Sequence, residues 1–311
     1  MSPRKRPTVA CLAGDGVGPE VMAEASRLLQ AVSRLHHFTL EERHASVAAE
    51  ALTRHGHALP SATRRAALAA DAVLVACPRD PAIAFVKAEL DLAATVRRAW
   101  FEDGGDVALV NPRSVDDTGW TIQRAVALAT TRRAKLACVS TDDAFRATVE
   151  LEAAKHPGVL VEHLSLSLAQ MVLREEPRHL DVLLAERSAA DAMADGAVGV
   201  VVAGTARLAR GGPSMFSPTH GAGLRIAGQG VANPAGMLLA SAMMLGDGLG
   251  RHAAARTLEG ALEQTLRAGI RTVDMVSAGV AASTREFTEA VLSELPRART
   301  DTEFITREAL A

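Results

Sequence analysis

The sequence predicts an α/β protein. Short apolar runs of strand length alternate along the chain with longer amphipathic stretches of helical spacing. With 311 residues, of which 48% are apolar and 23% charged, the chain can bury a large core. Its formal net charge of -2 creates no field that would attract nucleic acid or an anionic membrane. We therefore expect two domains or one large α/β unit, with no nucleic-acid partner.

The expected elements follow these patterns in order. Strands are predicted at Thr8–Ala13, Ala72–Ala76, Val107–Val110, Leu136–Ser140, Val159–His163, Val182–Ala185 and Val198–Val202. Helices are predicted at Pro19–Ser33, Ser61–Ala70, Ala88–Val96, Thr121–Thr130, Asp143–Ala154, Ala189–Asp195, Pro234–Leu249 and His252–Ala268. Glycine and proline gather at Arg210–Pro218 and Gly221–Pro234, which predicts irregular loops. Long loops in a compact protein are more often functional than linkers.

Targeting signals and metal-binding cysteine motifs are not expected. The apolar segment Thr8–Ala13 is too short for a signal peptide, and no apolar run reaches the roughly eighteen residues of a membrane span. The three cysteines, Cys11, Cys77 and Cys138, lie in or beside apolar runs and form no Cys-x-x-Cys pair. The ten histidines show no metal-ligand spacing. We expect buried free thiols in a reducing cytosol, and so a cytoplasmic protein with no membrane partner.

Three segments carry a resemblance to a known family. The first is Gly14-Asp15-Gly16-Val17-Gly18-Pro19-Glu20-Val21, whose small residues allow a tight turn and leave helix amides free to face a ligand. The second, from His220 to Pro234, reads His-Gly-Ala-Gly-Leu-Arg-Ile-Ala-Gly-Gln-Gly-Val-Ala-Asn-Pro. The third is Ser283-Thr284-Arg285-Glu286-Phe287. Together, over almost the whole chain, they resemble the isocitrate and isopropylmalate dehydrogenases, which are metal-dependent β-decarboxylating dehydrogenases.

This resemblance implies a two-domain α/β fold in which helices flank a large mixed sheet. The cofactor-binding domain would comprise residues 1–92 and 202–311. Residues 93–201 would form an inserted domain that binds substrate and dimerises, and Leu164–Leu173 is apolar enough to serve as the dimer surface. The expected partner is a second copy of the chain or another subunit of a hetero-oligomer.

The resemblance also predicts a cofactor site. In the family, a loop like that from His220 to Pro234 wraps the adenosine half of a nicotinamide cofactor, NADP or NAD. The residues that match its binding positions are Val17, His220, Gly221, Arg225, Ile226, Ala227 and Asn233. NAD-using members carry an acid at the position of Arg225. An arginine cannot accept hydrogen bonds from the ribose but pairs well with a 2′-phosphate, so NADP is the preferred prediction. The alternative is that Arg225 faces solvent in a loop that no longer binds anything.

Several residues of the family's catalytic centre are replaced. The resemblance implies Mg²⁺ or Mn²⁺ as Lewis acid, held here by Asp191 and Asp195, although acidic pairs at this spacing are often only a solvated helix face. Ser167 stands at the third metal aspartate, and Asp143 at the catalytic lysine; the partner subunit supplies both in the family. The family's tyrosine proton donor has no counterpart, because the chain contains no tyrosine.

Fewer of the arginines that bind substrate carboxylates in the family are kept. Lys87 and Arg97 match two of them, placed around the predicted helix Ala88–Val96, although an ordinary exposed helix face would explain both equally well. Asn111 takes the place of the third, and Arg113 is the candidate to replace it.

Two hypotheses from different classes follow. The first is a divergent oxidoreductase that oxidises a small 2-hydroxy acid with NADP or NAD and a metal. The second is a catalytically silent relative, acting as a regulatory or ligand-binding protein, because losses at several positions of one cooperating site remove most of its rate.

Overall fold

The computed structural model describes residues 6–276 and 279–308, which form two compact units of α/β structure. The first unit runs to Asp91 and resumes at Gly211, and the second comprises Leu92–Arg210. This architecture confirms the predicted fold class. The second boundary lies nine residues later than the 201/202 junction predicted from the sequence, because the strand that begins at Val200 continues to Ala209.

The first unit has a parallel sheet of four strands, in the order β2-β1-β3-β10. Its strands are β1 (Thr8–Leu12), β2 (Glu41–His44), β3 (Ala72–Val75) and β10 (Ser214–Pro218). Its helices are α1 (Gly18–Leu35), α2 (Ala48–His55), α3 (Ser61–Ala69), α4 (Pro81–Glu89), α9 (Ala235–Met243), α10 (His252–Arg267) and α11 (Thr284–Glu308). Short helical turns are η3 (Leu224–Ile226), η4 (Met244–Gly248) and η5 (Val273–Met275).

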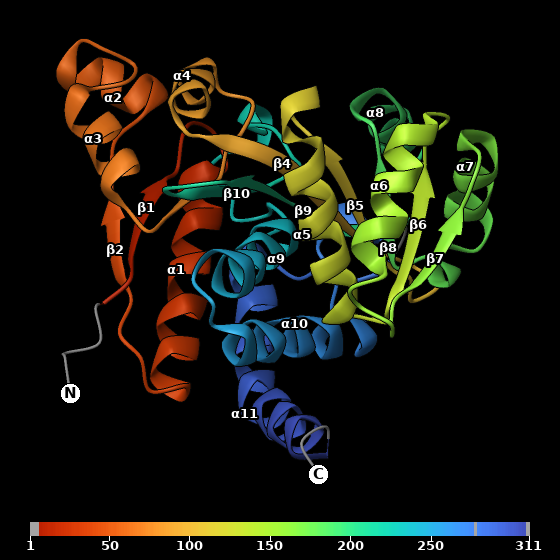
Figure 1. Ribbon diagram of the computed structural model, residues 1–311. Coiled ribbons are helices and arrows are strands. Elements are labelled where there is room, and N and C mark those ends of the chain that lie inside the picture. The colour runs from red at the N-terminus through yellow and green to blue at the C-terminus, as the bar shows by residue number, and fades with distance from the viewer. Residues whose placement is uncertain (1–5, 277–278, 309–311) are drawn as a thin grey trace, which may run out of the picture. The chain divides into compact units, whose positions relative to one another are not determined.

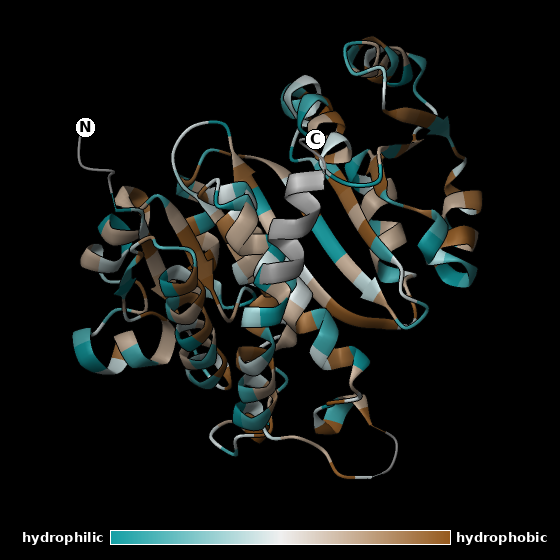
Figure 2. Ribbon diagram, turned by 90° about the horizontal axis from the view of Figure 1, so that it is seen from below, coloured by the Kyte–Doolittle hydropathy of each residue, from teal (hydrophilic) through white to brown (hydrophobic). Residues whose placement is uncertain are grey.

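Helix α1 anchors the core of the first unit. Proline occupies its first turn, where no amide hydrogen bond is lost, and one face of the helix is buried along its length. It contacts α9, α10 and α11, and Figure 1 shows it beside β1. The striping of hydrophobic and hydrophilic residues along the helices in Figure 2 reflects one buried and one solvent-facing side. Strands β1 and β3 are buried on both faces, as expected for the interior of a parallel sheet.

The second unit has a mixed sheet of six strands, in the order β9-β4-β5-β8-β6-β7. The strands are β4 (Leu92–Phe101), β5 (Asp106–Pro112), β6 (Lys135–Val139), β7 (Leu160–His163), β8 (Val182–Ala185) and β9 (Val200–Ala209). The helices are α5 (Thr118–Thr130), α6 (Asp143–Ala153), α7 (Leu166–Glu175) and α8 (Arg187–Asp195), with short turns η1 (Val115–Asp117) and η2 (Pro177–His179). Strand β4 pairs antiparallel with β9 and β5, whereas β5, β8, β6 and β7 run parallel.

Helices cover both faces of the parallel part of this sheet. One buried cluster joins alternate strand residues, among them Leu109, Val139 and Leu183, to Leu173 of α7 and Met193 of α8. The intervening strand residues face the other way, and α5 and α6, which contact each other, bury their own apolar sides. The unit is therefore a three-layer helix–sheet–helix arrangement in which α8 lies on the face of Leu109.

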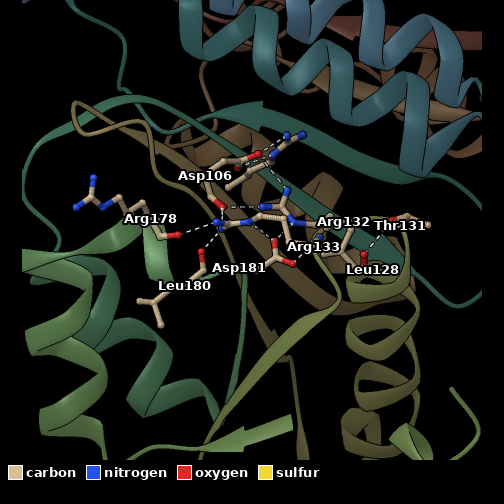
Figure 3. Close-up of polar contacts among 9 residues, drawn as sticks. Asp106, Leu128, Thr131, Arg132, Arg133, Arg178, Leu180 and Asp181 are labelled. Carbon is tan, nitrogen blue, oxygen red and sulfur yellow. Dashed lines mark hydrogen bonds and ion pairs between the residues drawn. The ribbon is translucent and has the colours of Figure 1, made fainter. Parts of the chain in front are cut away.

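A charged network joins the amino ends of β5, β8 and β6 (Figure 3). The Asp181 carboxylate, whose side chain is 0% exposed, accepts hydrogen bonds from Arg132 Nε at 2.7 Å and from the Arg133 amide at 2.9 Å. Asp106 pairs with Arg98 at 2.7 Å and with Arg132 at 3.2 Å. Burial acts to raise the pKa of Asp106, but the two arginines outweigh it and lower the pKa to about 2. Because both aspartates are paired with arginines, this network is suited to holding the strand ends together.

Two sequence predictions of secondary structure are wrong, and one polar strand was not predicted. The helix predicted at Ala88–Val96 is instead the end of α4 followed by β4, because residues from Leu92 pair with strands on both sides. The loop predicted at Arg210–Pro218 contains β10, whose apolar residues are buried beside β3. The polar strand β2 was not predicted, since Glu-Glu-Arg-His has no apolar alternation.

None of the described helices is long and apolar enough to cross a membrane.

We predict that Asp181→Asn lowers the free energy of unfolding by roughly 3–5 kcal/mol, because it removes the buried negative charge that faces Arg132 and Arg133. Urea unfolding of wild type and variant measures this loss. The matched control is Glu263→Gln, which breaks an exposed pair with Arg267 and should cost below about 0.5 kcal/mol. Equal losses in the two variants would show that Asp181 is no more important than a surface charge.

Candidate functional site

The turn after β1 is in direct contact with the loop that begins at His220. The Val17 amide donates a hydrogen bond to the Ala222 carbonyl at 2.8 Å. Gly16 has a φ of +64°, and a Cβ at this position would lie 1.8 Å from the same carbonyl oxygen. Only glycine satisfies both the left-handed backbone and the close approach. Two segments about two hundred residues apart are thus joined within the first unit.

Two further contacts fix the remainder of this loop. The Gly230 amide donates to Glu20 Oε2 of α1 at 3.2 Å. Thr284, the first residue of α11, donates from its amide to the Gly230 carbonyl at 2.8 Å and from its hydroxyl to the Ala232 carbonyl at 2.6 Å. Ser283 and Glu286 cap α11 reciprocally through hydrogen bonds of 2.8 and 3.1 Å. All three segments that carried the sequence resemblance therefore meet in one place.

His220, Asn233 and Asp274 form the polar part of this site. His220 Nδ1 lies 2.9 Å from the Gly221 carbonyl, which can only accept, so Nδ1 carries the proton. The buried Nε2 atom has no hydrogen-bond partner among the described residues. Burial lowers the pKa of His220, while its bond to Gly221 and the charge of Asp274 act to raise it. Neutral His220 thus offers an unused acceptor to a ligand.

Asn233 links the end of the loop to η5. Its Oδ1 accepts from the Ala235 amide at 2.9 Å at the start of α9, and its Nδ2 donates to Asp274 Oδ2 at 3.0 Å. Asp274 is exposed and also accepts from the Thr272 hydroxyl at 2.5 Å. The sequence analysis did not identify Asp274, because nothing in the chain around it signals that η5 returns to the loop.

The other predicted cofactor residues lie along the same loop. Arg225 and Ile226 are exposed on η3, whereas Gly221 and Ala227 are half-buried. Val17, at the start of α1, is buried under the loop, where its side chain would touch a Cβ at Gly223. The structure brings these residues together with His220 and Asn233.

In the second unit, Arg97 and Asp191 form an ion pair. Arg97 projects from the middle of β4, and its guanidinium donates to Asp191 Oδ1 of α8 at 2.5 Å and to Asn111 Oδ1 of β5 at 3.2 Å. Asn111 is buried at the carboxyl end of β5. Thr95 of β4 pairs with Asn111 of β5 on one side and with Arg207 of β9 on the other. Because alternate strand residues face the same way, Arg97, Asn111 and Arg207 lie on one face of the sheet, the face that α8 covers.

Arg207 of β9 is a second arginine on this face that the sequence analysis missed. It is half-buried beside Arg97, and burial lowers the pKa of its guanidinium, with the charge of Arg97 lowering it further. Its signal in the sequence was an arginine within an otherwise apolar strand. Arg97 and Arg207 thus place two neighbouring guanidinium groups on this face.

The predicted metal ligands do not fit a divalent cation as they stand. Asp191 Oδ1 is bonded to Arg97, and Asp191 Oδ2 lies 3.9 Å from Arg187 Nε. Asp195 is exposed one turn further along α8. A hard cation needs several oxygen ligands, and here the better placed carboxylate already faces two guanidinium groups. We therefore assign no chemistry to a metal at these residues.

The remaining predicted residues make other contacts or are exposed. Lys87 lies in the first unit on α4, where its Nζ donates to the Pro78 carbonyl at 2.6 Å. Arg113 is exposed and donates to the Leu92 carbonyl at 3.3 Å. Asp143 and Ser167 are exposed near the starts of α6 and α7. The expectation that Lys87 and Arg97 frame one helix is wrong, because Arg97 lies on a strand.

Comparison with known proteins decides the family. A family model described as isocitrate/isopropylmalate dehydrogenase matches residues 8–97 and 104–291. The chain belongs to this family. The 3-isopropylmalate dehydrogenase of Streptococcus mutans is 29% identical over 346 residues, covering 92% of this chain and 99% of that protein. That of Bacillus thuringiensis is 31% identical over 347 residues, covering 92% and 96%.

Solved structures of family members share the fold. A β-decarboxylating dehydrogenase from Thermococcus kodakarensis superposes with a TM-score of 0.79 at 25% identity, covering 94% of this chain and 96% of that one. An isocitrate dehydrogenase from Methylococcus capsulatus superposes with a TM-score of 0.77 at 21% identity, covering 93% and 99%. The resemblance stated from the three sequence segments is confirmed, and the chain is a member of the β-decarboxylating dehydrogenase family.

We predict that Gly16→Ala displaces the loop of residues 220–234, because its Cβ would collide with the Ala222 carbonyl. Hydrogen exchange should show lost protection at the Val17 amide. Gly56→Ala is a matched control, since Gly56 has a φ of +75° but nothing within 4 Å of an added Cβ. The control should lose only the roughly 1–2 kcal/mol of a left-handed alanine. Unchanged exchange at Val17 in Gly16→Ala would contradict this account of the contact.

Proposed function

We propose that this protein is an oxidoreductase that oxidises a small 2-hydroxy acid, with NADP preferred over NAD as hydride acceptor. The observation that carries this proposal is the closure of the His220–Pro234 loop onto the glycine turn at Gly16. A loop whose regular structure is limited to the short turn η3, and which is held from other parts of the chain, is a preformed surface for a ligand.

The residues of this surface fit the adenosine part of a dinucleotide. His220 Nε2 is a buried acceptor without a partner, which suits an N–H donor such as the adenine amino group. Arg225 is exposed on the same loop, where its guanidinium could pair with a 2′-phosphate. When bound, the nicotinamide would supply the hydride-accepting carbon. The protein's contribution is to bind and orient it.

The face around Arg97 suggests an acidic substrate. Arg97 and Arg207 lie close enough for the charge of one to act on the other, and Arg97 also pairs with the partly exposed Asp191. Asn111 adds a buried amide that orients Arg97. A substrate carboxylate could accept two parallel hydrogen bonds from a guanidinium. We infer that Arg97 and Arg207 select for acids.

No step is assigned to Mg²⁺ or Mn²⁺, since Asp191 is engaged by Arg97. The proton donor or base is also unassigned, because Asp143 replaces the family's lysine and the chain has no tyrosine. As further parts of the proposal, we expect a homodimer, or a subunit of a hetero-oligomer, that works in the cytoplasm.

A second candidate function is a catalytically silent relative that binds a nucleotide and an acid without turnover. The Arg97–Asp191 ion pair favours it, because a guanidinium there neutralises a carboxylate that the family resemblance would give to a metal. The absence of the family's catalytic lysine and tyrosine also favours a protein without turnover.

We predict that NADP binds more tightly than NAD, and that Arg225→Asp reverses this order by removing the cation and adding an acceptor for the ribose hydroxyls. The lost charged contacts should weaken NADP binding about tenfold to a hundredfold. Calorimetric titration of wild type, Arg225→Asp and the control Arg256→Asp on α10 measures the effect. Equal NADP affinity in all three proteins would show that Arg225 does not contribute to NADP binding.

We predict that a panel of 2-hydroxy acids with NADP or NAD, with and without Mn²⁺, contains a substrate, and that Arg97→Met lowers its kcat/KM roughly a hundredfold. The reason is the loss of charge-assisted hydrogen bonds to the substrate carboxylate, each worth about 1.5–3 kcal/mol. Arg124→Met, an exposed arginine of α5, is the control. No turnover with any acid, in a protein that binds NADP, would reject the oxidoreductase and support the silent relative.

A further inference from the structure

Cys11, Glu42 and His44 converge at the edge of the first unit's sheet. Strands β1 and β2 are parallel neighbours, and their register pairs Val9 with Glu42 and Cys11 with His44. The three side chains therefore lie on the same face of the two strands. The Cys11 sulfur, a Glu42 carboxylate oxygen and a His44 ring nitrogen all lie within 4.8 Å of one another.

The surroundings of this cluster favour a bound cation. The Glu42 side chain is only 9% exposed, and its Oε2 accepts a hydrogen bond from Ser26 Oγ of α1 at 2.5 Å. His44 Nε2 lies 3.5 Å from the same oxygen. No lysine or arginine pairs with Glu42 in the described part of the chain, whereas its neighbour Glu41 pairs with Arg43 at 2.8 Å. A nearly buried carboxylate without a lysine or arginine partner is stabilised by a positive ion.

We propose that Cys11, Glu42 and His44 form a binding site for a zinc-type divalent cation, with the fourth coordination position open to water. Thiolate, imidazole and carboxylate are the three ligand types that zinc takes from proteins. This site is separate from Asp191 and Asp195, which lie in the other unit and offer oxygen ligands only.

The geometry needs only a small adjustment to hold the ion. With metal–ligand distances of about 2.0–2.3 Å in a tetrahedron, the donor atoms would lie about 3.3–3.5 Å apart. The Glu42–His44 separation of 3.5 Å already matches this, and His44 is 55% exposed, so its side chain can move. Ser26 acts as a positioning residue, because its hydroxyl holds one oxygen of Glu42 and turns the carboxylate.

Binding would exchange a proton for the metal. Burial and, to a smaller extent, the charge of Glu42 raise the pKa of the Cys11 thiol to about 12. The thiol is therefore protonated without an ion, and coordination would release its proton to solvent as the metal–thiolate bond forms. Since β2 is an edge strand held only by β1, the ion would also fasten this edge.

The test uses Co²⁺ as a spectroscopic substitute for Zn²⁺ on the full chain. We expect one equivalent of Co²⁺ to give a thiolate-to-cobalt charge-transfer band, and Zn²⁺ to displace it. The band should disappear in Cys11→Ser. In His44→Gln, the apparent affinity for Co²⁺ should fall at least about tenfold. Cys77→Ser and Cys138→Ser are matched controls, because both are buried free thiols and should keep the band.

His44→Gln keeps the test decisive should Cys11→Ser fail to fold, since His44 is largely exposed and its replacement should not disturb the core. Competition with a chromophoric zinc chelator gives the affinities of wild type and His44→Gln independently of any enzymatic activity. Absence of the thiolate band in wild type, its survival in Cys11→Ser, or equal zinc affinity in His44→Gln and wild type would each overturn the proposal.

Discussion

The contact between Gly16 and Ala222 is the constraint on which the first unit's site depends. The Val17 amide reaches the Ala222 carbonyl at 2.8 Å only because Gly16 has no side chain. Once this end of the loop is fixed, the Gly230 amide lies within reach of Glu20, and Thr284 bonds to the other end. The loop is thus ordered by contacts with distant segments and not by its own secondary structure. The loop loses its conformational entropy when the protein folds, so ligand binding does not carry the free-energy cost of ordering it.

The second unit has two clusters of charged side chains, which differ in how deeply they are buried. At the amino ends of the parallel strands, Asp181 is fully buried, and each of its carboxylate oxygens accepts a hydrogen bond from Arg132 or Arg133. A buried carboxylate with both oxygens bonded in this way is suited to stability. On the face under α8, Arg97 pairs with the partly exposed Asp191, and Arg207 lies beside Arg97. The greater exposure of this pair suits the proposed binding of an acid.

The sequence predicted the parts of the fold whose signals are local. The turn at Gly14–Gly18 and the proline that starts α1 encode their structure within a few residues, and the apolar runs of β1, β3 and β8 are buried on both faces. Strand β4 was mistaken for a helix because its pattern Leu-Ala-Ala-Thr-Val has fair helical propensity, and only pairing with β5 and β9 decides the outcome.

Residues brought together across strands could not be found by spacing along the chain. Arg207 faces Thr95 through the β4–β9 register, more than a hundred residues away. Cys11 meets His44 only because β2 pairs with β1 in one register, and Asp274 meets Asn233 through a return of the chain after α10. Predicting such sites requires the strand order first. In contrast, the octapeptide and the fifteen-residue loop were specific enough to identify the family before any geometry was known.

The Arg97–Asp191 pair has a consequence for how the proposed function would operate. A substrate carboxylate must compete with Asp191 for Arg97, so binding would break one ion pair to form another, and the net gain in free energy would be small. Arg207 lies beside Arg97, so a carboxylate bound at Arg97 would also be attracted by this second guanidinium. The displaced carboxylate of Asp191 would stay near the bound acid and repel it, which lowers the net gain in free energy further.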